Sequence, residues 1–126
     1  MAVFVIATAA STNVRLGIDI ELPDRQLGVD RLARKLMTDP ERFALRSLTP
    51  EAARHSFLRM WTCKEAMSKA TGDGLSAPFG RISVHPGDAD QPQVLDGPAE
   101  YQPDGWALHR IAMPVPSFVT IAVHTA

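Results

Sequence analysis

The chain has 126 residues, of which 45% are hydrophobic and 21% charged, with a formal net charge of −1. These values are typical of one globular domain, which we expect to span residues 1–126, and not of a disordered chain. The near-zero charge gives none of the basic field that marks nucleic-acid-binding proteins. The single cysteine, Cys63, permits no intramolecular disulfide, which fits a reducing compartment. The apolar start, residues 2–10, is too short to span a bilayer, and no basic segment precedes it, so we expect a cytoplasmic protein.

Two apolar, β-prone runs at residues 3–8 and 14–21 flank the turn-forming residues 11–13, which predicts a β-hairpin. In the second run, strand alternation places Asp19 and Glu21 on the same face. Two carboxylates at this spacing repel each other without a counter-charge. They are therefore either exposed acidic residues near a strand end or ligands of a divalent cation.

Three helices are predicted in the middle of the chain. Residues 29–37 form a short one, and Thr38–Glu41 has the form of a capping box that opens a second, through about Leu45. A further start signal, Thr49–Pro50, opens a long helix that runs to about Thr71, where a Gly-Asp-Gly run supplies the stop.

The remaining strands lie after the long helix. Residues 80–84 predict a short strand, and the Pro- and Gly-rich stretch 86–105 predicts loop and turn. Residues 106–113 and 118–123 predict an antiparallel hairpin closed by residues 114–117. Helices grouped between two sets of strands indicate an α+β fold, an antiparallel sheet with helices packed on one face.

The long helix carries the residues of most chemical interest. Trp61, Glu65 and Lys69 follow one another at a spacing of four, so they lie on one helix face. Trp61 is interpreted as a core anchor. Glu65 and Lys69 alone are consistent with an exposed ion pair, which stabilises a helix by about 0.2–0.5 kcal/mol.

Together with the strand carboxylates, Glu65 indicates a different role. Asp19, Glu21 and Glu65 are hard oxygen ligands of the kind that magnesium prefers, and magnesium commonly completes its shell with water and substrate phosphate. Neighbouring lysines would then meet phosphate charge. The pattern favours magnesium-assisted chemistry on a phosphate ester. The histidines are scattered and are interpreted as surface or packing residues, and no Walker-type phosphate loop occurs.

Two motifs carry a family resemblance: LGIDIE at residues 16–21 and, about forty residues later, FLRMWTCKEAMSKATGDGL at residues 57–75. This pair resembles the two signatures of 4'-phosphopantetheinyl transferases. Trp61 and the DIE triplet resemble the branch typified by surfactin synthetase activators. The resemblance covers residues 16–84 firmly, and it implies one half, a single subdomain, of the 4'-phosphopantetheinyl transferase fold.

The resemblance implies transfer of the 4'-phosphopantetheine arm from coenzyme A to a serine of an acyl or peptidyl carrier protein, with release of 3',5'-ADP. By this analogy Asp19, Glu21 and Glu65 hold Mg²⁺. Glu65 also helps deprotonate the serine, and Lys69 neutralises phosphate charge. Lys64 is a weaker candidate for contact with coenzyme A.

The chain also departs from that branch, whose members are about twice as long and carry a Ser-His motif shortly before the strand carboxylates. It resembles only their C-terminal half, so we expect the site to be completed by a second copy or by a separate N-terminal-half subunit. The alternative is a non-catalytic half-domain, or a degenerate copy, that binds metal or carrier protein. The basic residues Arg31, Arg34 and Lys35 either meet an acidic carrier protein or form a solvated helix face. Carrier proteins of fatty acid, polyketide and peptide synthesis are all compatible with this resemblance.

Overall fold

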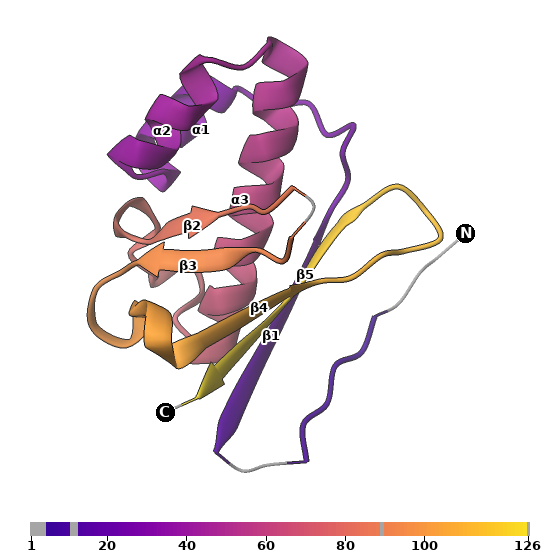
Figure 1. Ribbon diagram of the computed structural model, residues 1–126, viewed down its shortest axis with the longest axis vertical. Helices are drawn as coiled ribbons and strands as arrows, with labels where there is room; N and C mark the ends of the chain where they lie inside the picture. Colours follow the sequence, from indigo (N-terminus) through magenta and orange to yellow (C-terminus); the bar gives the residue numbers. More distant parts are fainter. Residues whose placement is uncertain (1–4, 11–12, 89, 126) are drawn as a thin grey trace.

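The computed structural model describes residues 5–10, 13–88 and 90–125. Its larger sheet is antiparallel, with the strand order β1–β5–β4 (Figure 1). These strands are β1 (Val14–Glu21), β4 (Trp106–Arg110) and β5 (Phe118–Thr125). A smaller antiparallel sheet pairs β2 (Ser83–His85) with β3 (Gln93–Asp96).

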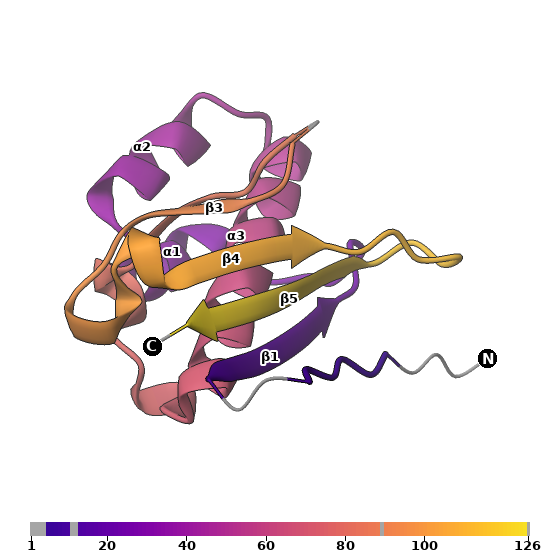
Figure 2. The ribbon, with the colours of Figure 1, turned by 60° about the horizontal axis from the view of Figure 1, so that its bottom comes forward.

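The helices are α1 (Val29–Leu36), α2 (Asp39–Arg46) and α3 (Pro50–Thr71). Helix α3 lies along one face of the β1–β5–β4 sheet, with α1 and α2 on the same side (Figure 2). This arrangement confirms the predicted α+β class with helices packed on one face of an antiparallel sheet.

The helix boundaries follow from local hydrogen bonding. The Thr38 hydroxyl accepts from the Glu41 backbone N–H and the Glu41 carboxylate accepts from the Thr38 N–H, which is the predicted capping box. The Thr49 hydroxyl accepts from the N–H of Ala52 at the start of α3. Gly72 ends α3 in the left-handed region at φ 85°, a conformation that favours glycine.

Strand β1 approaches helix α3 very closely at Gly17. A Cβ atom at this position would lie 1.8 Å from the Ala66 carbonyl oxygen and 2.6 Å from the Ala70 nitrogen. Only the missing side chain of glycine lets the strand backbone approach the helix backbone so closely. The β1 residues on this face, including Asp19, are therefore held directly against α3.

The predicted N-terminal hairpin is wrong for the described residues. Residues 5–8 form no strand, and residues 3, 4, 11 and 12 lie outside the described part of the chain. All eight residues of β1 instead pair with β5, with Asp19 opposite Thr120. Pairing between the two ends of the chain is long-range, and short-range turn signals do not report it.

The stretch from 79 to 105 is more structured than predicted. A 3₁₀ turn at Phe79–Arg81 replaces the start of the expected strand, and β2 begins only at Ser83. Four residues within the predicted loop form β3. The prediction missed this strand because a Pro- and Gly-rich composition is typical of loops and turns. The final hairpin is confirmed, with β4 ending earlier than predicted, at Arg110, and β5 reaching Thr125.

Candidate metal centre

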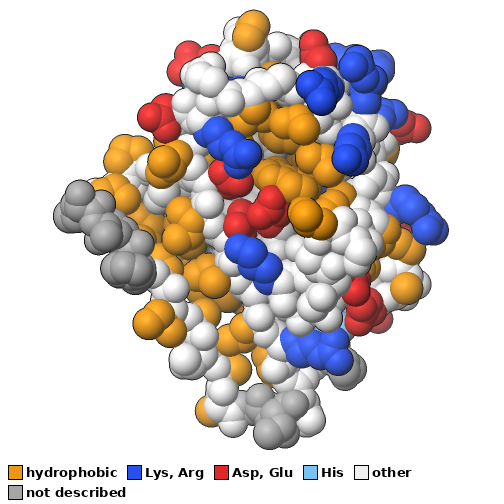
Figure 3. Space-filling model, turned by 180° about the vertical axis from the view of Figure 1, so that it is seen from behind, with side chains coloured by type: hydrophobic (Ala, Val, Ile, Leu, Met, Phe, Trp, Pro, Cys, Tyr) orange, Lys and Arg blue, Asp and Glu red, His pale blue; other side chains and the backbone are white. Residues whose placement is uncertain are grey.

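Three carboxylates meet between the end of β1 and the middle of α3. Ligand oxygens of Asp19, Glu21 and Glu65 all lie within 4.8 Å of one another. Asp19 is buried, and the two glutamates are partly buried. Acidic side chains gather near the middle of one face of the molecule, with basic side chains on either side (Figure 3). The structure thus brings together the three residues that the sequence predicted as ligands.

Two cations partly neutralise this cluster of three carboxylates. Lys69 Nζ donates to Asp19 Oδ1 at 2.9 Å and to the Ile18 carbonyl oxygen at 3.1 Å. The ion pair of Lys69 therefore bridges α3 to β1 instead of running along α3 to Glu65. Arg25 Nη1 donates to both carboxylate oxygens of Glu21, at 2.8 and 2.9 Å. Half of the Lys69 side chain remains exposed, so its ammonium is accessible from solvent.

The crowding of negative charge perturbs one carboxyl group strongly. Burial, followed by the charges of Asp19 and Glu21, raises the pKa of Glu65 from 4.5 to about 7, against the opposing effect of Lys69. The second oxygen of Asp19, Oδ2, is buried and has no hydrogen-bond partner among the described residues. A proton on Glu65 can supply that partner at neutral pH.

This donor set fits a magnesium ion. All three side chains offer carboxylate oxygens, which are hard ligands, and the cluster includes no sulfur or imidazole ligand of the zinc type. The buried, unpartnered oxygen of Asp19 costs free energy unless a cation or proton reaches it. A divalent cation would supply that contact and relieve the carboxylate repulsion that raises the pKa of Glu65.

The prediction that Lys64 contacts coenzyme A requires a correction, because the Lys64 side chain is fully buried. Its ammonium donates to Glu41 Oε1 at 2.6 Å and to the carbonyl oxygens of Leu36 at 2.8 Å and Phe79 at 2.9 Å. These contacts use all three donors of the ammonium group. Burial lowers the pKa of Lys64, and Glu41 opposes that shift. Lys64 braces α3 against the surrounding elements and has no donor left for coenzyme A.

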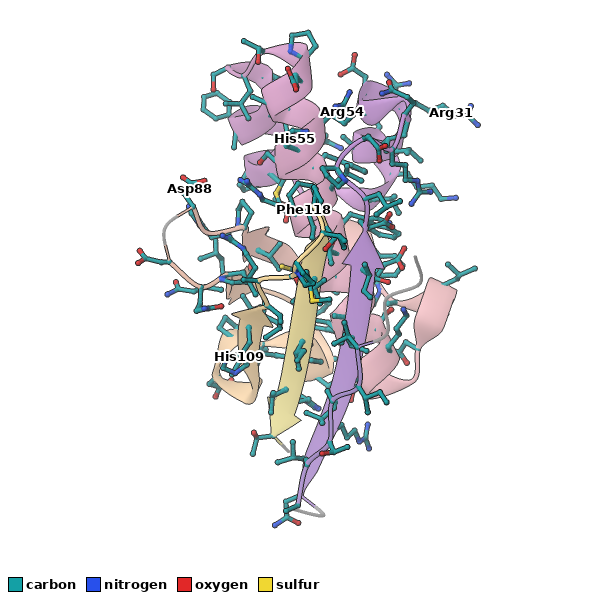
Figure 4. The ribbon with its side chains drawn as sticks, turned by 90° about the vertical axis from the view of Figure 1, so that its right-hand side faces the viewer. Arg31, Arg54, His55, Asp88, His109 and Phe118 are labelled. Carbon is teal, nitrogen blue, oxygen red and sulfur yellow. The ribbon has the colours of Figure 1, made fainter. Side chains whose placement is uncertain are left out.

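Trp61 and His55 occupy packing positions, as the sequence predicted. Trp61 is buried and packs edge-on against Phe79 at 4.8 Å between ring centroids. Burial raises the pKa of the Cys63 thiol to about 11, so the thiol is inert at neutral pH. His55 packs against the Phe118 ring, while His109 lies apart from it on β4 (Figure 4).

Two residues of this region were not predicted. The capping-box motif indicated Glu41 only as a helix cap, yet Glu41 also accepts from Lys64 and from the Val84 N–H at 2.9 Å. Arg25 follows Glu21 by four residues across a proline-containing turn, and nothing in strand or helix periodicity links them. The signal that could have predicted this ion pair is a basic residue shortly after a strand that carries two carboxylates.

The sequence model of the 4'-phosphopantetheinyl transferase superfamily matches residues 15–115. The chain therefore belongs to this superfamily. The 4'-phosphopantetheinyl transferase HetI of Nostoc sp. is 42% identical over 68 residues, which are 54% of this chain and 29% of HetI. The Synechocystis sp. protein slr0495 is 32% identical over 72 residues, which are 57% of this chain and 29% of that protein. The matched segment is thus less than a third of each relative.

Solved structures with the same fold are holo-(acyl-carrier-protein) synthases. The synthase of Bacillus anthracis, solved in complex with CoA (3',5'-ADP), matches with a TM-score of 0.68 and 23% sequence identity. The match covers 89% of this chain and 96% of the synthase chain. The Neisseria meningitidis enzyme has a TM-score of 0.62 at 20% identity over 89% and 98% of the two chains. The fold therefore corresponds to nearly all of these short synthases. No helix among the described residues is long and apolar enough to cross a membrane.

Proposed function

We propose that this chain transfers the 4'-phosphopantetheine arm of coenzyme A to a serine of an acyl or peptidyl carrier protein, with Mg²⁺ as cofactor. The observation that carries the proposal is the convergence of Asp19, Glu21 and Glu65 beside Lys69. Membership of the superfamily, and the CoA-bound synthase that shares the fold, support it.

The reaction is a substitution at phosphorus. The serine oxygen forms a bond to the β-phosphorus of coenzyme A, and the bond from that phosphorus to the bridging oxygen breaks. The leaving group is 3',5'-ADP, and the serine proton passes to a base. The bound cation would neutralise the pyrophosphate oxygens and favour the departure of the leaving group.

The chain's own residues take defined parts in this reaction. Glu65, whose pKa is about 7 in the metal-free chain, is the candidate acceptor of the serine proton, directly or through a water molecule. Lys69 is half exposed and reaches Asp19, so its ammonium can turn towards a phosphate placed over the cluster. Asp19 and Glu21 hold the cation.

We propose further that a second subunit, either another copy or an N-terminal-half chain, completes the site. Large apolar side chains flank the strand carboxylates, with Ile20 exposed by 41% and Leu22 by 55%. Exposed apolar residues beside a polar site are typical of an interface. Light scattering should therefore give a mass above that of the monomer. A strictly monomeric and active protein would contradict this part of the proposal.

The function is tested by incubating the protein with coenzyme A, Mg²⁺ and an apo carrier protein, followed by intact mass spectrometry of the carrier. The expected result is a mass increase equal to one phosphopantetheine arm. No increase with fatty acid, polyketide and peptide carriers, in a folded and assembled sample, would leave the non-catalytic alternative.

A further inference from the structure

Arg25 occupies an unusual position relative to the proposed metal ligands. It lies on a turn directly after β1, closed by a hydrogen bond of 3.2 Å from the Arg25 N–H to the Leu22 carbonyl. The turn folds the side chain back onto Glu21, the last residue of β1. A single nitrogen, Nη1, contacts both oxygens of the Glu21 carboxylate.

This geometry places the Arg25 cation on a carboxylate that a metal in the cluster would also need. An oxygen of Glu21 lies within 4.8 Å of ligand oxygens of Asp19 and Glu65, so it would be among the ligands of a cation held there. Arg25 Nη1 contacts both oxygens of Glu21, at 2.8 and 2.9 Å, so either oxygen is shared with the arginine. The Glu21 side chain is only 11% exposed, so little of it is open to other ligands. Arg25 is 52% exposed, and its side chain can move into solvent without disturbing the core.

The charges of the cluster also indicate that Arg25 occupies a carboxylate of the proposed metal site. Arg25 Nη1 contacts Glu21, whose ligand oxygen lies within 4.8 Å of those of Asp19 and Glu65, so the charge of Arg25 acts on all three carboxylates. The buried Oδ2 of Asp19, in contrast, has no hydrogen-bond partner in the part of the chain that the structure describes. The cluster thus has one carboxylate oxygen open to a cation and one carboxylate already occupied by an arginine.

We infer that Arg25 competes with the divalent cation for Glu21 and thereby sets the metal affinity of the site. Metal entry requires the Arg25 guanidinium to leave the carboxylate of Glu21. The inference rests on the proposed function, because it takes the three carboxylates as the metal site. It assigns to Arg25 a part in setting metal affinity that its position on a surface turn does not indicate.

The test is a titration with Mn²⁺ alone, followed by electron paramagnetic resonance of the free ion, on the wild-type chain and on Arg25→Gln. Removal of an exposed ion pair and of one positive charge near the ion is expected to tighten Mn²⁺ binding by about threefold to tenfold. Arg25→Lys keeps a cation on the turn, and its affinity is expected to stay within about twofold of wild type.

A matched control is Arg15→Gln, which makes the same charge change at the other end of β1. Arg15 lies six positions before Glu21, a distance of about 20 Å along the strand, which is beyond the Debye length at physiological salt. Its Mn²⁺ affinity should equal that of wild type. Unchanged or weaker binding by Arg25→Gln would overturn the competition, as would tightening of equal size in Arg15→Gln. If the wild-type chain and all variants fail to bind Mn²⁺, the proposed metal site itself is wrong.

Discussion

The contact between β1 and α3 predicts a large effect of Gly17→Ala. The new Cβ would lie 1.8 Å from the Ala66 oxygen, whereas ordinary contacts begin at 3.4 Å, so the helix must retreat by roughly 1.6 Å. Both partners are backbone atoms, which cannot swing aside as a flexible side chain can. Overpacking of this kind costs about 3 kcal/mol, the top of its usual range. For a chain of this size, that is a fall in Tm of about 10 °C.

The assay is thermal unfolding followed by circular dichroism, together with Mn²⁺ binding at a temperature where the variant is folded. Retreat of α3 also separates Glu65 from the strand carboxylates, so metal affinity should fall with stability. Gly28→Ala is the control, because the nearest atom to its added Cβ is 3.9 Å away, and it should cost about 0.5 kcal/mol as a cap effect. A Gly17→Ala protein that melts within about 2 °C of wild type and binds Mn²⁺ normally would refute this reasoning.

Three further predictions concern charged residues. Lys64→Met leaves the buried Glu41 carboxylate without its cation and should destabilise the fold by about 3 kcal/mol in urea unfolding. The Mn²⁺ affinity of the folded variant should be unchanged. A loss of coenzyme A affinity without loss of stability would restore a substrate role for Lys64. The pKa of Glu65 is raised to about 7 in the folded chain, so the folded state holds a proton that the unfolded state loses above pH 4.5. Without metal, the contribution of Glu65 to stability should therefore fall by about 1 kcal/mol, after allowance for solvent screening, as pH rises from about 4.5 to 7, and should level off above pH 7. Glu65→Gln should flatten this part of the pH profile of stability. An unchanged profile in the variant would contradict the raised pKa. Lys69→Met should reduce transfer by about 100-fold or more while Mn²⁺ still binds, because we propose that its charge acts on phosphate. Normal transfer kinetics in this variant would remove Lys69 from the proposed site.

The parts of the fold that sequence predicts best are those set by local chemistry. The capping box at Thr38 and the start of α3 at Thr49 each involve residues within three positions of one another, and both are confirmed. The pairing of β1 with β5 joins residues about a hundred positions apart, and no local signal reports it. The apolar run at residues 3–8 near β1 therefore suggested a hairpin that the described residues do not form.

In the candidate site, too, the features set by local geometry were predictable and those set by long-range packing were not. Residue type and period brought Asp19, Glu21 and Glu65 into one hypothesis, because strand and helix geometry each fix which side chains share a face. The partners of the lysines were not predictable in this way. Lys64 follows Cys63 and precedes Glu65, yet only the packing of α1, α2 and β2 around α3 shows that Lys64 faces the core and Glu65 the carboxylates.

The most direct test of the central claim compares wild type with Glu65→Gln in the carrier-protein assay, with Mg²⁺ and with a chelator. Wild type should transfer the phosphopantetheine arm only when Mg²⁺ is present. Glu65→Gln, in a sample that melts no lower than wild type, should be slower by at least about 100-fold, because it removes the proposed metal ligand and the proposed base in one substitution. Transfer by Glu65→Gln at a rate near that of wild type, or undiminished transfer by wild type in the chelator, would contradict the claim that these three carboxylates form the metal centre of a transferase.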